Sequence, residues 1–125
     1  MANAENAYIV ACGTMLQAEA GPEYANRAAK PAEDAGLTLI AGGPVGDKVE
    51  VLEGALPEGT QFMAIERFPS MEALQSFWHS EGYQSAIPFR RESVKMHFIV
   101  ALEGTTPEEL SPKLEQIRER SSSNE

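Results

Sequence analysis

The sequence has a single cysteine, Cys12, in 125 residues, so no disulfide can form within the chain. A lone cysteine is typical of a protein in a reducing compartment. Basic residues are also scarce, because 10 lysines and arginines stand against 19 aspartates and glutamates, for a net charge of -9. Nucleic acids and anionic membranes are bound by basic side chains, so this deficit argues against nonspecific binding to either.

Long apolar segments are absent as well. No apolar run approaches the roughly 20 residues that span a bilayer, and residues 1–7 lack a basic region followed by an apolar core. We therefore expect a cytoplasmic protein without a membrane partner. Apolar residues make up 42% of the sequence and charged residues 23%, which is typical of one globular domain with a single core.

Signatures of nucleotide, metal and nucleophilic chemistry are missing from the sequence. There is no glycine-rich phosphate loop, no Gly-x-Gly-x-x-Gly, no His-Glu-x-x-His and no pair of cysteines for zinc. The only two histidines, His79 and His97, fall on different predicted elements. The sequence therefore predicts no metal site and no bound cofactor.

Apolar periodicity and turn residues divide the chain into strands and helices. Strands are expected at 7–16, 37–41, 49–56, 61–68 and 94–102, and helices at 22–35, 70–80 and 106–120. Pro31 should kink or end the first helix near Lys30. Gly82 and Pro88 should break the segment after the second helix into a turn and a short helix.

Two helix starts carry capping signals. Ser70 precedes the helix at 70–80, and Thr106 with Glu109 forms a capping box ahead of the last helix. That last helix has a sparse apolar stripe, and residues 121–125 should fray. We therefore divide the chain into a core domain at 1–105 and a C-terminal helix and tail at 106–125.

Alternation assigns the faces of two strands. In 61–68, Glu66 shares a face with Phe62, Ala64 and Phe68, while Arg67 lies on the opposite face. In 94–102, one face should present Met96, Phe98, Val100 and Leu102.

The order of these elements is that of an α+β ferredoxin-like sandwich, an antiparallel sheet with two helices on one face. The other face of the sheet would then present apolar side chains to water. An apolar face of that size usually marks an interface, so we expect a homodimer formed through the open sheet face.

Five segments of the sequence together resemble the small bacterial family called domain of unknown function 1330. They are residues 51–54, 65–73, 77–84, Arg90 and 101–104, within a resemblance that covers about Tyr8 to Gly104. Members resemble the dimeric α+β barrel superfamily, which holds small monooxygenases, muconolactone-type isomerases, polyketide cyclases and amino-acid-sensing domains. The resemblance implies a ferredoxin-like protomer in a sheet-to-sheet dimer, but so varied a superfamily does not supply a reaction.

Two residues are candidates for catalysis. Glu66 should be partly buried, where a carboxyl group must be paired or have a raised pKa, so it is either a catalytic or binding carboxylate or an ion-pair partner of Arg90. His79 ends a helix, where an imidazole can act as an acid or base or can simply satisfy terminal carbonyls.

Four residues are candidates for ligand binding. Arg90 could hold a carboxylate or could pair with Glu81 or Glu92. Trp78 and Tyr83 could line a pocket or pack the core, and Glu53 is a weaker candidate after a short apolar run.

Two hypotheses follow for the function of the chain. One is a homodimer that binds a small, partly apolar or carboxylated compound, as a cofactor-free isomerase, cyclase or oxygenase. The alternative is a non-catalytic structural or ligand-sensing dimer. Whether the chain is an enzyme is left open by its residues.

Overall fold

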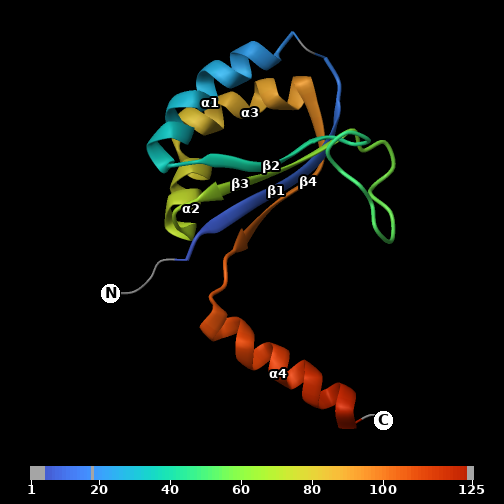
Figure 1. The fold of residues 1–125 in the computed structure, drawn as a ribbon. Coiled ribbons are helices and arrows are strands. Elements are labelled where there is room, and N and C mark those ends of the chain that lie inside the picture. Colours follow the sequence, from blue (N-terminus) through green and yellow to red (C-terminus); the bar gives the residue numbers. More distant parts are fainter. Residues whose placement is uncertain (1–4, 18, 124–125) are drawn as a thin grey trace.

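The computed structural model of the protein describes residues 5–17 and 19–123, which fold into a sheet with helices. The elements follow in the order β1 (Ala7–Met15), α1 (Gly21–Ala35), β2 (Thr38–Pro44), β3 (Phe62–Phe68), α2 (Met71–His79), α3 (Glu81–Ser93), β4 (Val94–Glu103) and α4 (Pro107–Ser123). Helices α1, α2 and α3 lie on one side of the sheet, whereas α4 extends away from it (Figure 1).

The four strands form an antiparallel sheet in the order β2-β3-β1-β4. On the central strand β1, Ile9 pairs with Glu66 of β3 and with Ala101 of β4. The sheet is open and does not close into a barrel within the described residues. This topology confirms the predicted ferredoxin-like α+β fold.

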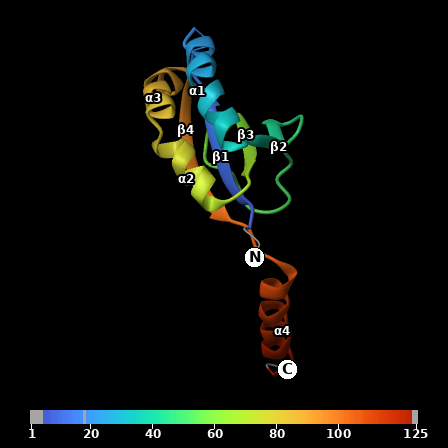
Figure 2. The same ribbon diagram turned by 90° about the vertical axis from the view of Figure 1, so that its left-hand side faces the viewer.

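The core lies between the sheet and the helices that cover one of its faces (Figure 2). Ile9 and Phe68 of the sheet pack against Leu74, Phe77 and Ile87 of the helices, where their apolar surface is removed from water. The opposite side of the sheet, called here the open face, carries the alternate residues Tyr8, Val10, Met63, Ile65, Phe98, Val100 and Leu102. Val100 and Leu102 on this face are 47% and 58% exposed.

Serine caps fix where α2 and α3 begin. The Ser70 hydroxyl accepts a hydrogen bond from the Ala73 amide at 3.0 Å, as predicted, and the Ser80 hydroxyl accepts one from the Tyr83 amide at 3.1 Å. Because Ser80 both ends α2 and caps α3, Trp78 and Tyr83 lie close together at this junction.

The prolines do not end the helices in which they lie. Helix α1 continues through Pro31, and residues 81–93 form one helix that contains Pro88. The prediction counted the local cost of proline but not the packing around it. Helices α1 and α3 approach so closely that a Cβ on Gly82 would lie 2.7 Å from Cγ of Pro31.

The strand predicted at 49–56 is wrong. Residues 45–61 form a loop whose one bridge joins Val45 to Val49. Its apolar residues find no partner strand in the described chain, and Leu52 is 87% exposed. β-Branched composition favours a strand only where a neighbour supplies the ladder and the packing.

The face assigned to Met96 is also wrong, because β4 carries a bulge opposite Cys12 and Gly13. Gly13 pairs with Met96 and Cys12 pairs with Phe98, so the strand changes phase between them. Met96 therefore lies on the helix-covered side with Ile99, while Phe98 stays on the open face.

Helix α4 starts at the predicted capping box. The amide of Glu109 donates to the Thr106 hydroxyl at 3.1 Å, and the Thr106 amide donates to the Glu109 carboxylate at 3.3 Å. The helix continues to Ser123, beyond the expected end near Arg120, and residues 124–125 lie outside the described residues. None of the described helices combines the length and apolarity needed to cross a membrane.

Candidate functional site

A cavity with a volume of about 290 Å³ lies between the sheet and the helices and is called here the polar cavity. The polar residues that line it are Glu66 on β3, Tyr24 on α1 and Tyr83 on α3. Glu66 faces this space because it alternates with Arg67 along β3, which confirms its predicted face. Burial raises the pKa of the Glu66 carboxyl group, since an ionised carboxylate is poorly solvated there.

The two tyrosines join α1 to α3 through their hydroxyl groups. Their oxygens lie 3.1 Å apart in a hydrogen bond, and their rings meet edge to face with centroids 6.1 Å apart. Burial raises the pKa of both Tyr24 and Tyr83, and the nearby Glu66 carboxylate raises both further. Both phenols are therefore held in the neutral form, in which each can donate a hydrogen bond.

Arg90 is a buried cation beside the tyrosine pair. Its side chain is 5% exposed, and its Nε and Nη1 atoms make no hydrogen bond within the described part of the chain. The guanidinium carbon lies 5.7 Å from the ring centroid of Trp78. Such a cation–π contact stabilises the charge but leaves the in-plane N–H donors unused.

Arg90 and Glu66 both lie near the tyrosine pair. The positive charge of Arg90 lowers the pKa of each tyrosine and Glu66 raises it, so both charges act on the same two hydroxyl groups. No ion pair shorter than 4 Å joins Arg90 to an acidic residue in the parts of the chain that the structure describes. The expected pairing of Arg90 with Glu66, Glu81 or Glu92 is therefore not formed.

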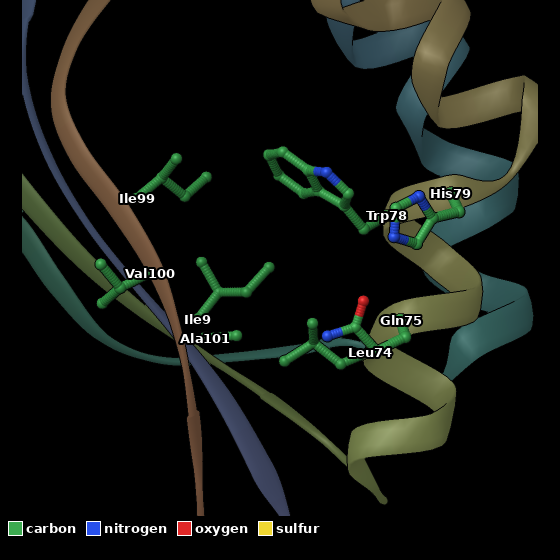
Figure 3. Close-up of a pocket in the computed structure, with 8 residues that line it drawn as sticks. All are labelled: Ile9, Leu74, Gln75, Trp78, His79, Ile99, Val100 and Ala101. Atoms are coloured by element: carbon green, nitrogen blue, oxygen red, sulfur yellow. The ribbon is translucent and has the colours of Figure 1, made fainter.

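A second cavity of about 300 Å³, the apolar cavity, lies between α2 and the strands β1 and β4 (Figure 3). Its lining is mainly apolar and comprises Ile9, Leu74, Gln75, Trp78, His79, Ile99, Val100 and Ala101. The indole of Trp78 extends from α2 towards Ile99. The centroid of the Tyr83 ring lies 5.4 Å from that of the Trp78 ring. Ile9 and Ile99 line both cavities, which are therefore neighbours.

The structure brings together most of the residues singled out from the sequence. Glu66 and Tyr83 line one cavity, Arg90 lies beside Tyr83, and Trp78 contacts both Tyr83 and Arg90. His79 is exposed and lines the apolar cavity, so it is not placed beside the Glu66 carboxyl group. The catalytic and binding roles of these residues remain predictions.

Glu53 does not join this cluster. It is exposed in the loop 45–61 and lines neither of the two cavities. Within the described residues, no group of three histidine, cysteine, aspartate or glutamate side chains is arranged to hold a metal ion. The groups of the cluster are an arginine suited to binding an anion, a carboxyl group suited to exchanging a proton, and two tyrosine hydroxyls that can donate hydrogen bonds.

Tyr24 is the residue of the polar cluster that the sequence interpretation missed. A signal existed, because Tyr24 is followed along α1 by Ala25, Ala28, Ala29 and Ala32, which all line the polar cavity. Small side chains at helical spacing leave space against the sheet that larger apolar residues would fill. A tyrosine at the end of such a row marks the polar side of that space.

The model of the family described as domain of unknown function (DUF1330) matches residues 6–105, and the chain belongs to this family. The match confirms the resemblance inferred from the sequence and ends before α4 begins. No curated protein matches the chain.

Several solved structures share the fold. A protein of unknown function from Rhodopseudomonas palustris is 18% identical, with a TM-score of 0.63 over 82% of this chain and 85% of that one. A hydroxynitrile lyase from Passiflora edulis is 14% identical, with a TM-score of 0.55 over 82% of this chain and 98% of that one. A putative antibiotic biosynthesis monooxygenase from Caulobacter crescentus is 14% identical, with a TM-score of 0.50 over 83% and 93%. Identities this low show a common fold and leave the reaction open.

Proposed function

We propose that this DUF1330 protein binds a small organic carboxylate next to the polar cavity, where Arg90, which lies beside the cavity residue Tyr83 and does not itself line the cavity, holds the anion. The observation that carries the proposal is the Arg90 side chain, 5% exposed, with Nε and Nη1 unpaired. A buried charged group without hydrogen bonds costs several kcal/mol of folding free energy, on the order of 3–5 when a partner is removed. A ligand carboxylate offsets this cost by accepting charge-assisted hydrogen bonds from the guanidinium.

The same cavity is suited to moving a proton on the bound compound. The raised pKa of Glu66 makes its carboxylate a stronger base than an exposed glutamate. The neutral hydroxyls of Tyr24 and Tyr83 can donate hydrogen bonds to an oxygen that gains negative charge. This set fits an isomerase or cyclase that removes a proton from carbon beside a carbonyl group. His79, at the rim of the apolar cavity, is the second candidate for this step.

The alternative is a ligand-sensing dimer in which the carboxylate is bound and not converted. Both versions place a second copy of the chain on the open face, because Val100 and Leu102 expose apolar surface there next to Val10 and Ile65. Sheet-to-sheet packing of two copies buries this surface and forms the two-sheet assembly implied by the family resemblance.

The test is binding of carboxylic acids and of the amides of the same acids, measured by calorimetry and by thermal shift. The wild-type protein should bind acids and not amides, because only the acids carry a negative charge that can pair with the Arg90 guanidinium. Arg90→Met should weaken binding at least about 30-fold, since losing one partner of a buried charge pair costs about 2 kcal/mol or more.

Two controls separate binding from folding. Arg91→Met removes the exposed neighbouring arginine and should leave the binding constant unchanged. Arg90→Met should unfold at the same or a higher temperature than the wild type without ligand, because an unpaired buried charge is removed. Equal affinity of wild type and Arg90→Met for acids would overturn the proposal.

A further inference from the structure

The polar and apolar cavities meet at two shared residues. Ile9 of β1 and Ile99 of β4 contribute to the walls of both, whereas Trp78 lines the apolar cavity alone and Arg90 lines neither. The Trp78 ring faces the apolar cavity while it also contacts Tyr83 and the Arg90 guanidinium. A molecule with its charged end at Arg90 therefore has the indole and an apolar space directly beside it.

No lysine, arginine, aspartate or glutamate lines the apolar cavity. Leu74, Ile9, Ile99 and Ala101 line it with hydrocarbon, and its polar side chains are Gln75 and His79 on α2. In Figure 3 the side chains of Ile9 and Ile99 point across the gap towards α2, whereas Val100 points away from it. Such a space favours hydrocarbon, because transfer from water contributes about 0.8 kcal/mol for each buried methylene group.

Size gives a second reason to combine the two spaces. Each cavity, at about 290 and 300 Å³, lies at the lower end of the range of roughly 300–1,000 Å³ found for ligand pockets. A compound confined to one cavity is limited to about 300 Å³. Occupying the neighbouring space extends the contact without any new polar partner.

We propose that the ligand is an amphiphilic acid whose carboxylate is held by Arg90 and whose hydrocarbon part occupies the apolar cavity against Trp78. The proposal rests on the proposed function, because it assumes that a carboxylate binds at Arg90. It adds the chemical class of the rest of the molecule, an aliphatic chain or a phenyl-sized ring. It also assigns Trp78, Leu74 and Ile99 as residues that select for this part.

The experiment is a series of straight-chain carboxylic acids from acetate to octanoate, with phenylacetate added, titrated into the full chain. Binding is measured by calorimetry and by the fluorescence of Trp78, the single tryptophan of the sequence. Affinity should rise about fourfold with each added methylene until the apolar cavity is filled, and Trp78 emission should change with the longer acids. Affinity independent of chain length in the wild type would overturn the proposal.

Two matched variants locate the effect. Ala101→Leu narrows only the apolar cavity and should abolish the dependence on chain length while short acids still bind. Ala28→Leu narrows only the polar cavity and should weaken all acids alike. An unchanged chain-length dependence in folded Ala101→Leu contradicts the assignment of this cavity.

The outcomes also distinguish the two proposals. If no acid of any length binds the wild type, the proposed function fails and this inference fails with it. If acids bind through Arg90 but chain length has no effect, only the amphiphilic ligand is excluded. The wild-type series decides this point even if a variant does not fold.

Discussion

The hydroxyl oxygens of Tyr24 and Tyr83 lie 3.1 Å apart and connect α1 to α3 above the sheet. Each tyrosine is acted on by the negative charge of Glu66 and the positive charge of Arg90. The pair thus connects the proposed anion holder to the proposed proton carrier through groups that are neutral at physiological pH. A carboxylate bound at Arg90 comes within the same group of side chains that contains the Glu66 carboxyl group.

The tyrosine pair predicts loss of stability at alkaline pH. Burial raises the pKa of Tyr24 and Tyr83 in the fold above the value of about 10 that they have in an unfolded chain. Their contribution is complete below pH 10 and is lost as pH rises towards the folded values, because only the unfolded chain releases these protons readily. Unfolding should coincide with the tyrosinate absorbance of two of the three tyrosines.

Tyr24→Phe tests the assignment of this alkaline transition. The variant should lose part of the pH dependence above pH 10, measured as the free energy of unfolding in urea at several pH values. Ionisation of all tyrosines near pH 10 in a protein that stays folded would contradict the burial of the pair.

Glu66→Gln should stabilise the ligand-free protein at pH 7. Because burial raises the pKa of Glu66, the neutral carboxyl group contributes stability that is complete below its unfolded value of about 4.5. That stability is lost as pH rises through the folded value, and each pKa unit of the shift is worth about 1.4 kcal/mol. The gain from glutamine should therefore be present at pH 7 and shrink towards pH 4.

The measurement is urea unfolding of the wild type and Glu66→Gln at pH 7 and pH 4. Glu58→Gln, in the exposed part of the loop 45–61, serves as the control and should be neutral at both pH values. A Glu66→Gln variant less stable than the wild type at pH 7 would mean that the carboxylate is paired in solution.

Gly82→Ala should destabilise the protein although alanine is the better helix former. A Cβ at this position would lie 2.7 Å from Cγ of Pro31, and the proline ring cannot turn aside as a flexible side chain can. Overpacking of this kind costs about 1–3 kcal/mol, which exceeds the gain in helix propensity of up to about 1 kcal/mol. Denaturant unfolding should show a net loss of up to about 2 kcal/mol.

Gly21→Ala is the matched control for this substitution. Gly21 begins α1, and a Cβ added there meets no atom within 4 Å. The change should be neutral or slightly stabilising, because it only reduces the freedom of the unfolded chain. Equal effects of the two substitutions would show that α1 and α3 can move apart at no cost.

The antiparallel α+β fold was predicted from the order of the elements, and the face of Glu66 was predicted correctly because β3 is regular. The errors share a cause, which is that long-range contacts override local preference. Pro31 stays helical where α1 meets Gly82, and residues 49–56 lack a partner strand. The bulge that moves Met96 to the other face arises from the pairing of β4 with β1. The alternation of residues within β4 alone does not reveal it.

The candidate site was only partly predictable for the same reason. Arg90 and Tyr83 belong to a segment rich in polar and aromatic residues, and this concentration is a property of the sequence alone. Tyr24 is far from that segment in sequence and joins it only because α1 packs beside α3. His79 was grouped with Glu66 by their closeness along the chain, whereas the fold assigns them to different cavities.

Substitution on the open face should separate the proposed homodimer into monomers. Leu102 is 58% exposed on β4, and a lysine there would have to be buried without a partner between two packed sheets. Leu102→Lys should raise the dimer dissociation constant at least about tenfold, since burial of a leucine contributes about 1.5–3 kcal/mol. Leu52→Lys, in the exposed loop, is the control and should leave it unchanged.

Light scattering during size-exclusion chromatography measures both variants against the wild type. The wild type should elute with twice the mass of the 13.6 kDa chain at micromolar concentration. A wild-type monomer at this concentration would exclude a stable dimer on the open face.

Removal of residues 106–125 should leave a folded core with weaker dimerisation. Helix α4 extends away from the sheet, and its apolar stripe of Leu110, Leu114 and Ile117 is 43%, 49% and 59% exposed (Figure 2). Little apolar burial is lost with the helix, so the free energy of unfolding should fall by less than about 1 kcal/mol. The truncated chain should therefore still unfold cooperatively, within a few degrees of the full chain. The exposed stripe has the helical spacing of a docking face, and a second copy offers the apolar open face that could cover it.

Leu114→Lys in the full chain should weaken dimerisation as the truncation does, with the helix kept intact and its helix content checked by circular dichroism. Loss of cooperative unfolding in the truncated chain would instead make α4 part of the core.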